Sequence, residues 1–390
     1  MGDRVPMKCA EASRIARACM LIAAGSFLLH CGGRTGLDET RASGGSRGDA
    51  AAPEDAPSLE ASPCMPAPAG GIAIGSSPES VISIAVAVAG STVYAGTAAI
   101  DQASPLYVGA ISSVPSGGGP TQPLTAPGYN FGNVASDGAR LYYPQTSGRP
   151  QGPDGAIYTV LGLASIDLTT GALHPITTLA PPWSTSSNLN SDMIAAAPAW
   201  PGVFWIGGMS GTDGAGTLSV WNAQSDAVTT IATGQSLSGL AVDASGVYWA
   251  DTGGGQGITV YSSPLGGGPP STLANVPGGT HGVLLGVSTT DVVFVSNYLT
   301  GAIETVSKAG GSVRHLASAT SAWVNAFAWV EDPYLYFTES ATPTTLERIL
   351  VAGGTTEVVP TQGQIQSLAF DACSVYIGSI DPTQVFVQPK

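Results

Sequence analysis

One short pattern recurs seven times along this chain of 390 residues, and it constrains the fold more than any other feature. Each copy is a three-residue apolar stretch, and the copies are centred on Tyr94, Tyr142, Phe204, Tyr248, Val293, Tyr336 and Tyr376. By subtraction, the centres lie 48, 62, 44, 45, 43 and 40 residues apart. Units that repeat at such a period must stack on one another to bury their apolar faces, so the repeat predicts the whole architecture.

Strand and turn signals flank each copy of this pattern. A short apolar run precedes it, as GLAVD does before Tyr248, and a further strand with a Gly-rich hairpin such as SPLGGGPPSTL follows it. Gly and Pro suit the tight turns, while β-branched residues fill the strands. Units of four strands with a period of about 40 to 45 residues are typical of β-propeller blades. We therefore predict an all-β, seven-bladed propeller over residues 64–390, with almost no helix.

Composition supports a β-rich core and excludes one class of partner. The chain is 43% hydrophobic and only 10% charged, and its 52 Gly and 29 Pro disfavour helices. Inner propeller strands are apolar on both faces, which explains continuous runs such as AVAVA. The formal net charge of -14 would repel phosphate backbones, so nucleic acid is not an expected partner.

The last unit is one strand short. Its sequence, SLAFDACSVYIGSIDPTQVFVQPK, supplies three strands before the chain ends, and the apolar segment GGIAIG at residues 70–75 precedes the first unit. We predict that this N-terminal segment adds the missing outermost strand and closes the ring. Closure would remove an exposed sheet edge.

Residues 1–30 have the features of an export signal. A basic start precedes the apolar stretch 18–29, whose 12 residues are too few to span a bilayer, since that takes roughly 20 residues. The following LLHCGG resembles the lipobox of bacterial lipoproteins, and this resemblance implies a lipid anchor at Cys31. His30 departs from the small residue that lipoproteins have before the cysteine, so an ordinary secretory signal is the alternative. Residues 31–63 lack aromatic residues and predict a disordered tether.

The expected location is therefore the cell envelope, either periplasmic or at the outer membrane, with membrane contact only through the N-terminal lipid. This location bears on the five cysteines. Cys9 and Cys19 leave with the signal and Cys31 carries the lipid, so that only Cys64 and Cys373 remain. An oxidising compartment favours a disulfide between them, and two unpaired thiols are the alternative. Ring closure would bring Cys64 beside the last blade, where the bond would close a loop of about 300 residues.

The fourth unit, GLAVDASGVYWADTGGGQGITVYSSPLGG, resembles a blade of the YWTD and NHL-type propellers. Its neighbours resemble the propeller repeats of exported bacterial lipoproteins of unassigned function. The resemblance extends over about residues 66–390, is strongest in units four to six, and implies a binding or scaffold module more often than an enzyme. YWTD propellers have six blades, whereas this chain has seven units.

The residues just before each innermost strand line the mouth of a propeller's central channel. Here they are polar: Asn133, Asp192, Ser238, His281, Asn325 and Gln366. We expect them to bind an unidentified protein, peptide or glycan, in a monomeric, membrane-tethered module without a cofactor or a metal. Any hydrated channel mouth would also be polar, which is the alternative interpretation of these residues.

His281 suggests an alternative function. A seven-bladed propeller lyase family uses a histidine at the channel mouth as general base, and this resemblance implies a lyase or hydrolase. That function requires a second acid, base or metal ligand near His281, for which Glu304 and Glu339 are candidates. His174 and His315 fall on outer hairpins, so we expect no histidine cluster for a metal.

Aspartates recur in the first turn of three units, at Asp137, Asp243 and Asp371. An Asp that opens a tight turn accepts a hydrogen bond from the backbone two residues further on. Because Gly, Ala and Ser flank these turns and supply no second carboxylate, we predict a structural role and not a metal site.

Overall fold

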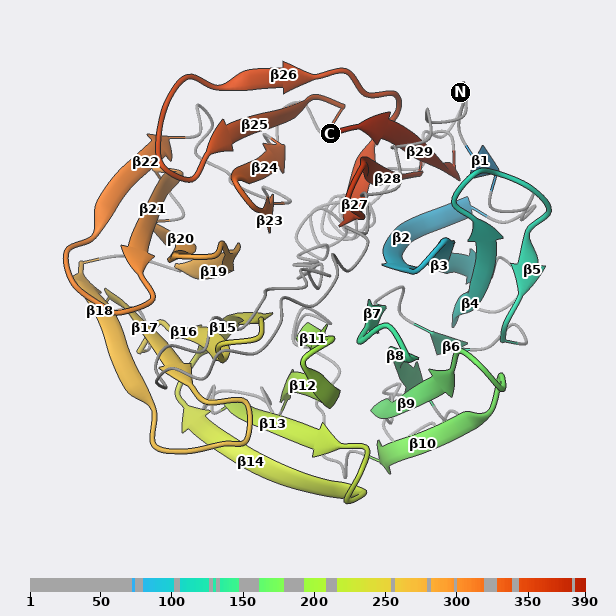
Figure 1. Cartoon of the computed structure of the whole chain (residues 1–390), viewed down its shortest axis with the longest axis horizontal. Helices are drawn as coiled ribbons and strands as arrows, with labels where there is room; N and C mark the ends of the chain where they lie inside the picture. Colours follow the sequence, from blue (N-terminus) through green and yellow to red (C-terminus); the bar gives the residue numbers. More distant parts are fainter. Residues whose placement is uncertain are drawn as a thin grey trace, which may run out of the picture.

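The computed structural model describes residues 72–73, 80–101, 106–125, 129–130, 134–146, 161–178, 193–207, 216–253, 257–278, 282–297, 300–318, 328–338, 344–380 and 383–390. These residues form seven antiparallel sheets around a central axis (Figure 1). The chain is therefore an all-β, seven-bladed propeller, as the repeat predicts. The described part of the chain contains no helix that could cross a membrane.

The strands of the first three blades follow the chain order. Blade 1 contains β2 (Ser80–Ala89), β3 (Thr92–Asp101), β4 (Leu106–Pro115) and β5 (Gln122–Pro123). Blade 2 contains β6 (Tyr129–Asn130), β7 (Ala135–Ser136), β8 (Arg140–Thr146), β9 (Leu161–Asp167) and β10 (Leu173–Thr178). Blade 3 contains β11 (Met193–Ala197), β12 (Trp200–Gly207), β13 (Gly216–Asn222) and β14 (Ala227–Gly234).

The remaining four blades complete the ring. Blade 4 contains β15 (Leu237–Val242), β16 (Val247–Asp251), β17 (Gly257–Ser263) and β18 (Ser271–Pro277). Blade 5 contains β19 (Val283–Val287), β20 (Asp291–Asn297), β21 (Ala302–Ser307) and β22 (Arg314–Ser318). Blade 6 contains β23 (Ala328–Glu331), β24 (Tyr334–Thr338), β25 (Leu346–Leu350) and β26 (Glu357–Val359). Blade 7 contains β27 (Ile365–Phe370), β28 (Ser374–Ile380), β29 (Thr383–Pro389) and β1 (Ile72–Ala73).

Blade 2 departs from the predicted four strands, because its sheet has five. Its innermost position is shared by β6 and β7, which both pair with β8. Tyr129 of β6 lies opposite Thr146 at one end of β8, and Ser136 of β7 lies opposite Leu141 near the other end. Two short strands therefore take the place of a single innermost strand. They belong to unit two, and the spacing between units two and three is the longest in the repeat.

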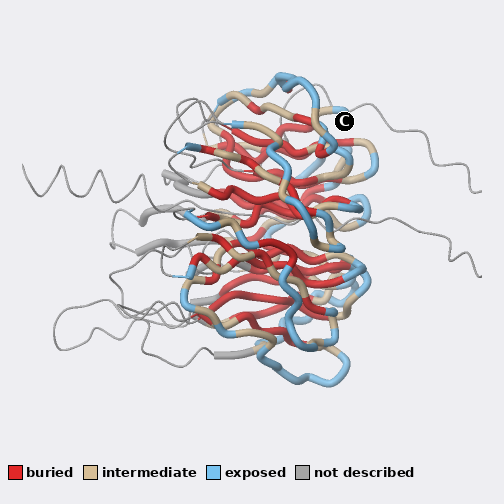
Figure 2. The backbone as a smooth tube through the Cα atoms, turned by 90° about the vertical axis from the view of Figure 1, so that its left-hand side faces the viewer, coloured by how far each residue is buried: buried red, intermediate tan, exposed pale blue. Residues whose placement is uncertain are grey.

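The core consists of apolar layers between neighbouring blades. Tyr248 and Ile258 of blade 4, for example, pack in one cluster with Leu284 and Phe294 of blade 5. Figure 2 shows, from the side, that buried residues run through the middle of the molecule while exposed residues gather at its turns. All six residues of the innermost strand β27 are buried, which explains why such strands have apolar runs without alternation.

Glycines allow the innermost strands of neighbouring blades to approach one another. Gly239 has a φ of 68°, and a Cβ atom built there would lie 2.2 Å from the carbonyl oxygen of Leu284 in blade 5. At Gly286, in blade 5, a Cβ atom would lie 2.9 Å from Cβ of Val330 in blade 6. Only residues without a side chain fit these two positions, which fixes the spacing of the blades near the axis.

The last blade combines the two ends of the described chain. The short strand β1 pairs antiparallel with β29, with Ile72 opposite Val385 and Ala73 opposite Gln384. It lies within the apolar segment 70–75, whose other residues fall outside the described residues. The predicted signal, the tether, Cys31 and Cys64 also fall outside them.

Candidate functional site

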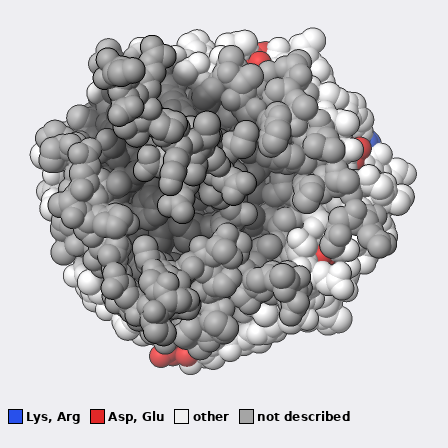
Figure 3. Space-filling view, turned by 180° about the vertical axis from the view of Figure 1, so that it is seen from behind, with Lys and Arg blue, Asp and Glu red and all other residues white. Residues whose placement is uncertain are grey.

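The antiparallel strands give the propeller two distinct faces. The turns between first and second strands and between third and fourth strands lie on one side, which we call the turn face. The innermost strand of each blade begins on the opposite side, where the predicted channel mouth lies, and we call this side the mouth face. Figure 3 shows the molecule from behind, and the charged side chains of described residues seen there lie towards the margin.

Two of the six predicted mouth residues are described. Asn133, Asp192, His281 and Asn325 lie outside the described residues, so their proximity to one another stays a prediction. Ser238 and Gln366 occupy equivalent positions near the start of the innermost strands β15 and β27. Both are the second residue of their strand, whereas the sequence pattern predicts them just before it, and their part in lining a channel mouth stays a prediction.

Ser238 links two blades. Its hydroxyl donates a hydrogen bond of 2.8 Å to the backbone carbonyl of Gly282, the residue that follows His281 in the sequence. The side chain is half-buried, and its single donor is already used. Ser238 therefore holds the start of blade 5 in position, and its hydroxyl has no second proton to donate to a ligand.

Gln366 is buried. Only 3% of its surface is exposed, and its side-chain oxygen has no hydrogen-bond partner. A buried amide oxygen without a partner is costly, and a partner that reached it would gain a hydrogen bond. Glu304 on β21 likewise has one buried, unpartnered carboxylate oxygen, while Glu339 lies outside the described residues. Within the described ranges, no three His, Cys, Asp or Glu side chains form a group that could hold a metal ion.

The turn-face aspartates have the structural role that the sequence predicts. Oδ1 of Asp137 accepts hydrogen bonds from the backbone N–H groups of Ala139 at 2.9 Å and Arg140 at 2.7 Å. The hydroxyl of Tyr142 donates to its other oxygen at 2.6 Å. One carboxylate thus holds both the turn and a tyrosine of the second strand.

Asp371 in blade 7 repeats this geometry. Its Oδ1 accepts from the backbone N–H groups of Cys373 at 2.8 Å and Ser374 at 2.7 Å, and the Tyr376 hydroxyl donates to its Oδ2 at 2.7 Å. Burial, together with this carboxylate, raises the pKa of Tyr376 to about 12. Burial and the Asp137 carboxylate likewise raise the pKa of Tyr142 well above its ordinary value.

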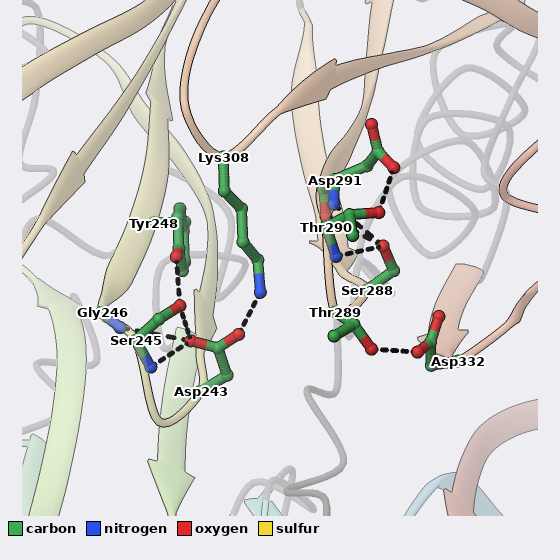
Figure 4. A network of polar contacts seen from close by, with 10 residues as sticks. All are labelled: Asp243, Ser245, Gly246, Tyr248, Ser288, Thr289, Thr290, Asp291, Lys308 and Asp332. Atoms are coloured by element: carbon green, nitrogen blue, oxygen red, sulfur yellow. Dashed lines mark hydrogen bonds and ion pairs between the residues drawn. The ribbon is translucent and has the colours of Figure 1, made fainter. Parts of the chain in front are cut away.

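In blade 4 the turn aspartate also binds the next blade. Oδ1 of Asp243 accepts from the backbone N–H groups of Ser245 at 2.8 Å and Gly246 at 3.2 Å. Its Oδ2 contacts the ammonium group of Lys308, which comes from the third turn of blade 5 and also lies 5.4 Å from the centre of the Tyr248 ring (Figure 4). The Lys308 side chain is only 14% exposed, so this ion pair is shielded from solvent more than an ordinary surface pair.

Similar contacts join the blades that follow. Blade 5 has Ser288 where blade 4 has Asp243, and the Ser288 hydroxyl accepts from the Asp291 backbone N–H at 3.0 Å. The next residue, Thr289, donates to Asp332 in the first turn of blade 6 (Figure 4). Lys390, at the end of blade 7, donates to Glu331 of blade 6 at 2.6 Å. The turn face is thereby cross-linked from blade 4 to blade 7.

Blades 2 and 3 meet in an aromatic contact near the rim. His174 on β10 packs against Trp221 of β13 with ring centres 5.4 Å apart and ring planes tilted by 31°, and its Nε2 lies 3.3 Å from Oδ1 of Asp226. The Trp221 indole N–H donates to the same oxygen at 3.0 Å. These two hydrogen bonds, that of Trp221 first, lower the pKa of Asp226. His174 and His315 both lie on outermost strands, β10 and β22, as the sequence predicts.

The sequence did not predict the cross-blade role of Lys308 and Lys390, because ion pairing over such separations leaves no local pattern. The tyrosine near each turn aspartate could have been predicted from the sequence. Tyr142, Tyr248 and Tyr376 each follow their aspartate by five residues, and this constant spacing was the available signal. Tyr142 and Tyr376 donate directly to the aspartate, whereas the Tyr248 hydroxyl pairs with that of Ser245, which donates to Asp243.

Comparisons with known proteins identify the fold alone. No family model and no curated protein matches the sequence. The β-propeller domain of the Trilobed protease from Pyrococcus furiosus is similar, with a TM-score of 0.53, 11% identity, and coverage of 78% of this chain and 94% of that chain. An acylaminoacyl peptidase from Pyrococcus horikoshii is also similar, with a TM-score of 0.51, 10% identity, and coverage of 76% of this chain and 48% of that chain. These two likenesses support the propeller architecture.

Proposed function

We propose that this chain is a binding or scaffold module that presents the mouth face of a rigid propeller to a protein, peptide or glycan. One observation carries the proposal: the two faces are built differently. The turn face has short turns that internal hydrogen bonds and cross-blade ion pairs hold, as at Asp243 and Lys308. On the mouth side, the described strand ends of blades 2 and 3 are separated by longer stretches of sequence: β8 ends at Thr146 and β9 begins at Leu161, while β10 ends at Thr178 and β11 begins at Met193.

The composition of these long connections supports recognition. Residues 147–160 and 179–192 contain Ser, Thr, Asn, Gly and Pro with one tyrosine and one tryptophan, Tyr158 and Trp183. Binding surfaces commonly combine aromatic side chains, which supply contact area, with small polar ones, which supply adaptable hydrogen bonds. Connections on a rigid scaffold are also where binding residues concentrate. A composition of this kind favours a binding function over catalysis.

The proposal can be tested by shortening the mouth connections. A variant in which residues 147–160 and 179–192 are replaced by short Gly-Ser linkers is compared with a control in which residues 265–268, on the turn face, carry the same linker. Both are assayed by biolayer interferometry against immobilised glycan, peptide and peptidoglycan-fragment panels. For the panel member that the wild-type protein binds, we expect the affinity of the first variant to be lower on the order of 100-fold and that of the control to be unchanged.

Two outcomes would overturn the binding proposal. Equal loss of affinity in both variants would place the contact elsewhere. Turnover of a panel member that disappears in His281→Ala would instead establish the lyase or hydrolase alternative. Thermal unfolding of both linker variants shows whether each remains folded.

We also propose that the chain is an envelope lipoprotein anchored through Cys31. The basic start, the short apolar stretch and LLHCGG support this proposal. Wild-type protein should partition into the detergent phase of a Triton X-114 extraction, and Cys31→Ser should move to the aqueous phase. Identical partitioning of the two proteins would exclude the anchor.

A third part of the proposal concerns ring closure by β1 and a Cys64–Cys373 disulfide. The antiparallel register of β1 on β29 directs the N-terminal end of β1 towards the end of β29, where the Lys390 N–H donates to the Cys373 carbonyl at 3.0 Å. A disulfide over so long a loop typically stabilises by about 2 to 4 kcal/mol. Cys373→Ser should lose that amount and expose one reactive thiol. Two reactive thiols in the unreduced, unfolded mature wild type would contradict the bond.

A further inference from the structure

The outermost strand of blade 3, β14, has an open edge. It is eight residues long and pairs with β13 on one side, and no described strand pairs with its other side (Figure 1). The outermost strands of the other blades are shorter: β5 has two residues, β10 six, β18 seven, β22 five, β26 three and β1 two. The longest unpaired edge among the described strands is therefore that of β14.

Most of the other outer strands carry a feature that discourages the addition of a further strand. Native proteins protect sheet edges with proline, with charge, or with a covering segment. Pro123 ends β5 and Pro175 lies within β10, and charged residues lie on β22 and β26. The edge of β18 is approached by the next blade, since the Gly311 N–H donates to the Leu273 carbonyl at 3.4 Å.

The strand β14 has none of these features. Its sequence, AVTTIATG, contains no charge and no proline, and β-branched residues fill five of its eight positions. A bulge at Ile231 interrupts the pairing with β13, but Ala227 to Thr230 stay in continuous register with it. All four of these residues are exposed, and the Val228 side chain is a large apolar one with 48% of its surface exposed. This half of β14 is a regular template for another strand.

A fixed negative charge marks one end of this edge. Asp226 directly precedes β14, and 69% of its side chain is exposed although Trp221 and His174 hold one of its oxygens. The second oxygen therefore remains available to a cation on a neighbouring strand. The net charge of -14 would also steer cationic partners towards the protein.

We propose that the open edge of β14 accepts an extended segment of another protein as an additional antiparallel strand, and that this segment is rich in β-branched residues and ends in Lys or Arg. In antiparallel pairing the C-terminal end of the added strand lies beside the start of β14, where Asp226 meets its cation. A second copy of this chain would place Gly234 there, which has no charge to offer. Charge complementarity thus favours a heterologous basic segment over self-pairing.

This edge lies at the rim of the propeller, and the proposal does not depend on the mouth face. The probe is a fluorescent ten-residue peptide of alternating threonine and valine that ends in two lysines, and its binding to the purified protein is followed by anisotropy. Val228→Lys, which adds an edge charge, should weaken binding by about 10-fold or more. Val358→Lys is the matched control, because Val358 is 67% exposed on the short outer strand β26. It should leave binding unchanged.

A second pair of variants tests the charge. Asp226→Asn should weaken binding of the lysine-ended peptide by about threefold to tenfold and leave binding of a glutamine-ended peptide unchanged. The control is Asp167→Asn, at the start of the third turn of blade 2, which should change the binding of neither peptide. Equal effects of Val228→Lys and Val358→Lys would overturn the proposal. So would a wild-type dimer in sedimentation that Val228→Lys abolishes, without any peptide binding, because that result assigns the edge to a second copy.

Discussion

The strands β14 and β15 are nearly consecutive in the sequence, yet they occupy opposite ends of the blade radius. Only residues 235 and 236 separate them, but β14 is the outermost strand of blade 3 and β15 the innermost strand of blade 4. Along β14 the first four residues are exposed, whereas β15 is buried except for the half-buried Ser238. Distance from the propeller axis, and not position in the sequence, therefore decides what each strand must contain.

This comparison shows two different constraints on a β-strand. Near the axis, blades converge, so that Gly239 is required where β15 meets Leu284 of the next blade. At the rim, blades diverge and side chains gain solvent, so polar Thr residues suit β14. The loss of unfolding free energy caused by a substitution should therefore become smaller from the axis outwards.

The largest effect is expected at Gly239→Ala. The residue has a φ of 68°, and its new Cβ would lie 2.2 Å from a backbone oxygen that cannot move away alone. Left-handed strain and overpacking together should cost about 3 kcal/mol or more. Gly267→Ala is the control, since its φ is 82° and a Cβ atom there meets nothing within 4 Å. It should cost about 1 kcal/mol, and equal losses in urea unfolding would refute the role of close approach.

An intermediate effect is expected at the first turns. Asp243→Ala removes the acceptor of two backbone N–H groups and leaves the partly buried Lys308 without its carboxylate. The free energy of unfolding should fall by about 2 kcal/mol. Ser288→Ala, at the equivalent position of blade 5, removes the hydrogen bonds of one turn hydroxyl but leaves no charged partner unpaired, and should cost about 1 kcal/mol. Chemical denaturation of both variants measures the difference, and a larger loss at Ser288 would contradict it.

A smaller effect is expected from alkaline pH. Tyr376 has a folded-state pKa of about 12, above the ordinary value near 10. Its contribution to stability is complete below pH 10 and is lost as the pH rises from 10 through 12, because the unfolded chain releases the proton first. The unfolding free energy of wild type should fall over this range more steeply than that of Tyr376→Phe. Parallel declines of the two proteins would show that Tyr376 is not responsible.

The smallest effect is expected at the rim. Val228→Lys lies on the exposed half of β14, where solvent accommodates the new charge, so the free energy of unfolding should change by no more than about 0.5 kcal/mol. Thermal unfolding compares it with the wild type. A loss similar to that of Gly239→Ala would break the proposed gradient from axis to rim.

The sequence predicts the blades well because each carries its own signals. The seven strand centres and the aspartate turns are local patterns: the centres lie in the second strands of the sheets and the three aspartates lie in the first turns, as predicted. The division between β6 and β7 could not be predicted, because nothing in the local sequence tells that two short segments will share the partner β8.

The candidate site was less predictable, since it depends on contacts between blades. The sequence indicates that Ser238 and Gln366 lie near the start of innermost strands, but it does not reveal that Ser238 is hydrogen-bonded to Gly282 and that Gln366 is buried. Both facts follow from the neighbouring blade. The position of a polar residue within its unit indicates where it lies in the blade. Whether its side chain is available to a ligand depends on packing against the neighbouring blade, which the sequence of a single unit does not determine.

The two lysine contacts on the turn face run in one direction around the ring. Lys308 of blade 5 reaches back to Asp243 of blade 4, and Lys390 of blade 7 reaches back to Glu331 of blade 6. In both cases the ammonium group follows a third strand, β21 or β29, and the carboxylate lies at the end of the first strand of the preceding blade, β15 or β23. A gene duplication that copied a unit with an ammonium group after its third strand and a carboxylate after its first would copy both halves of this joint, so a ring built in this way could gain a blade without a new kind of interface.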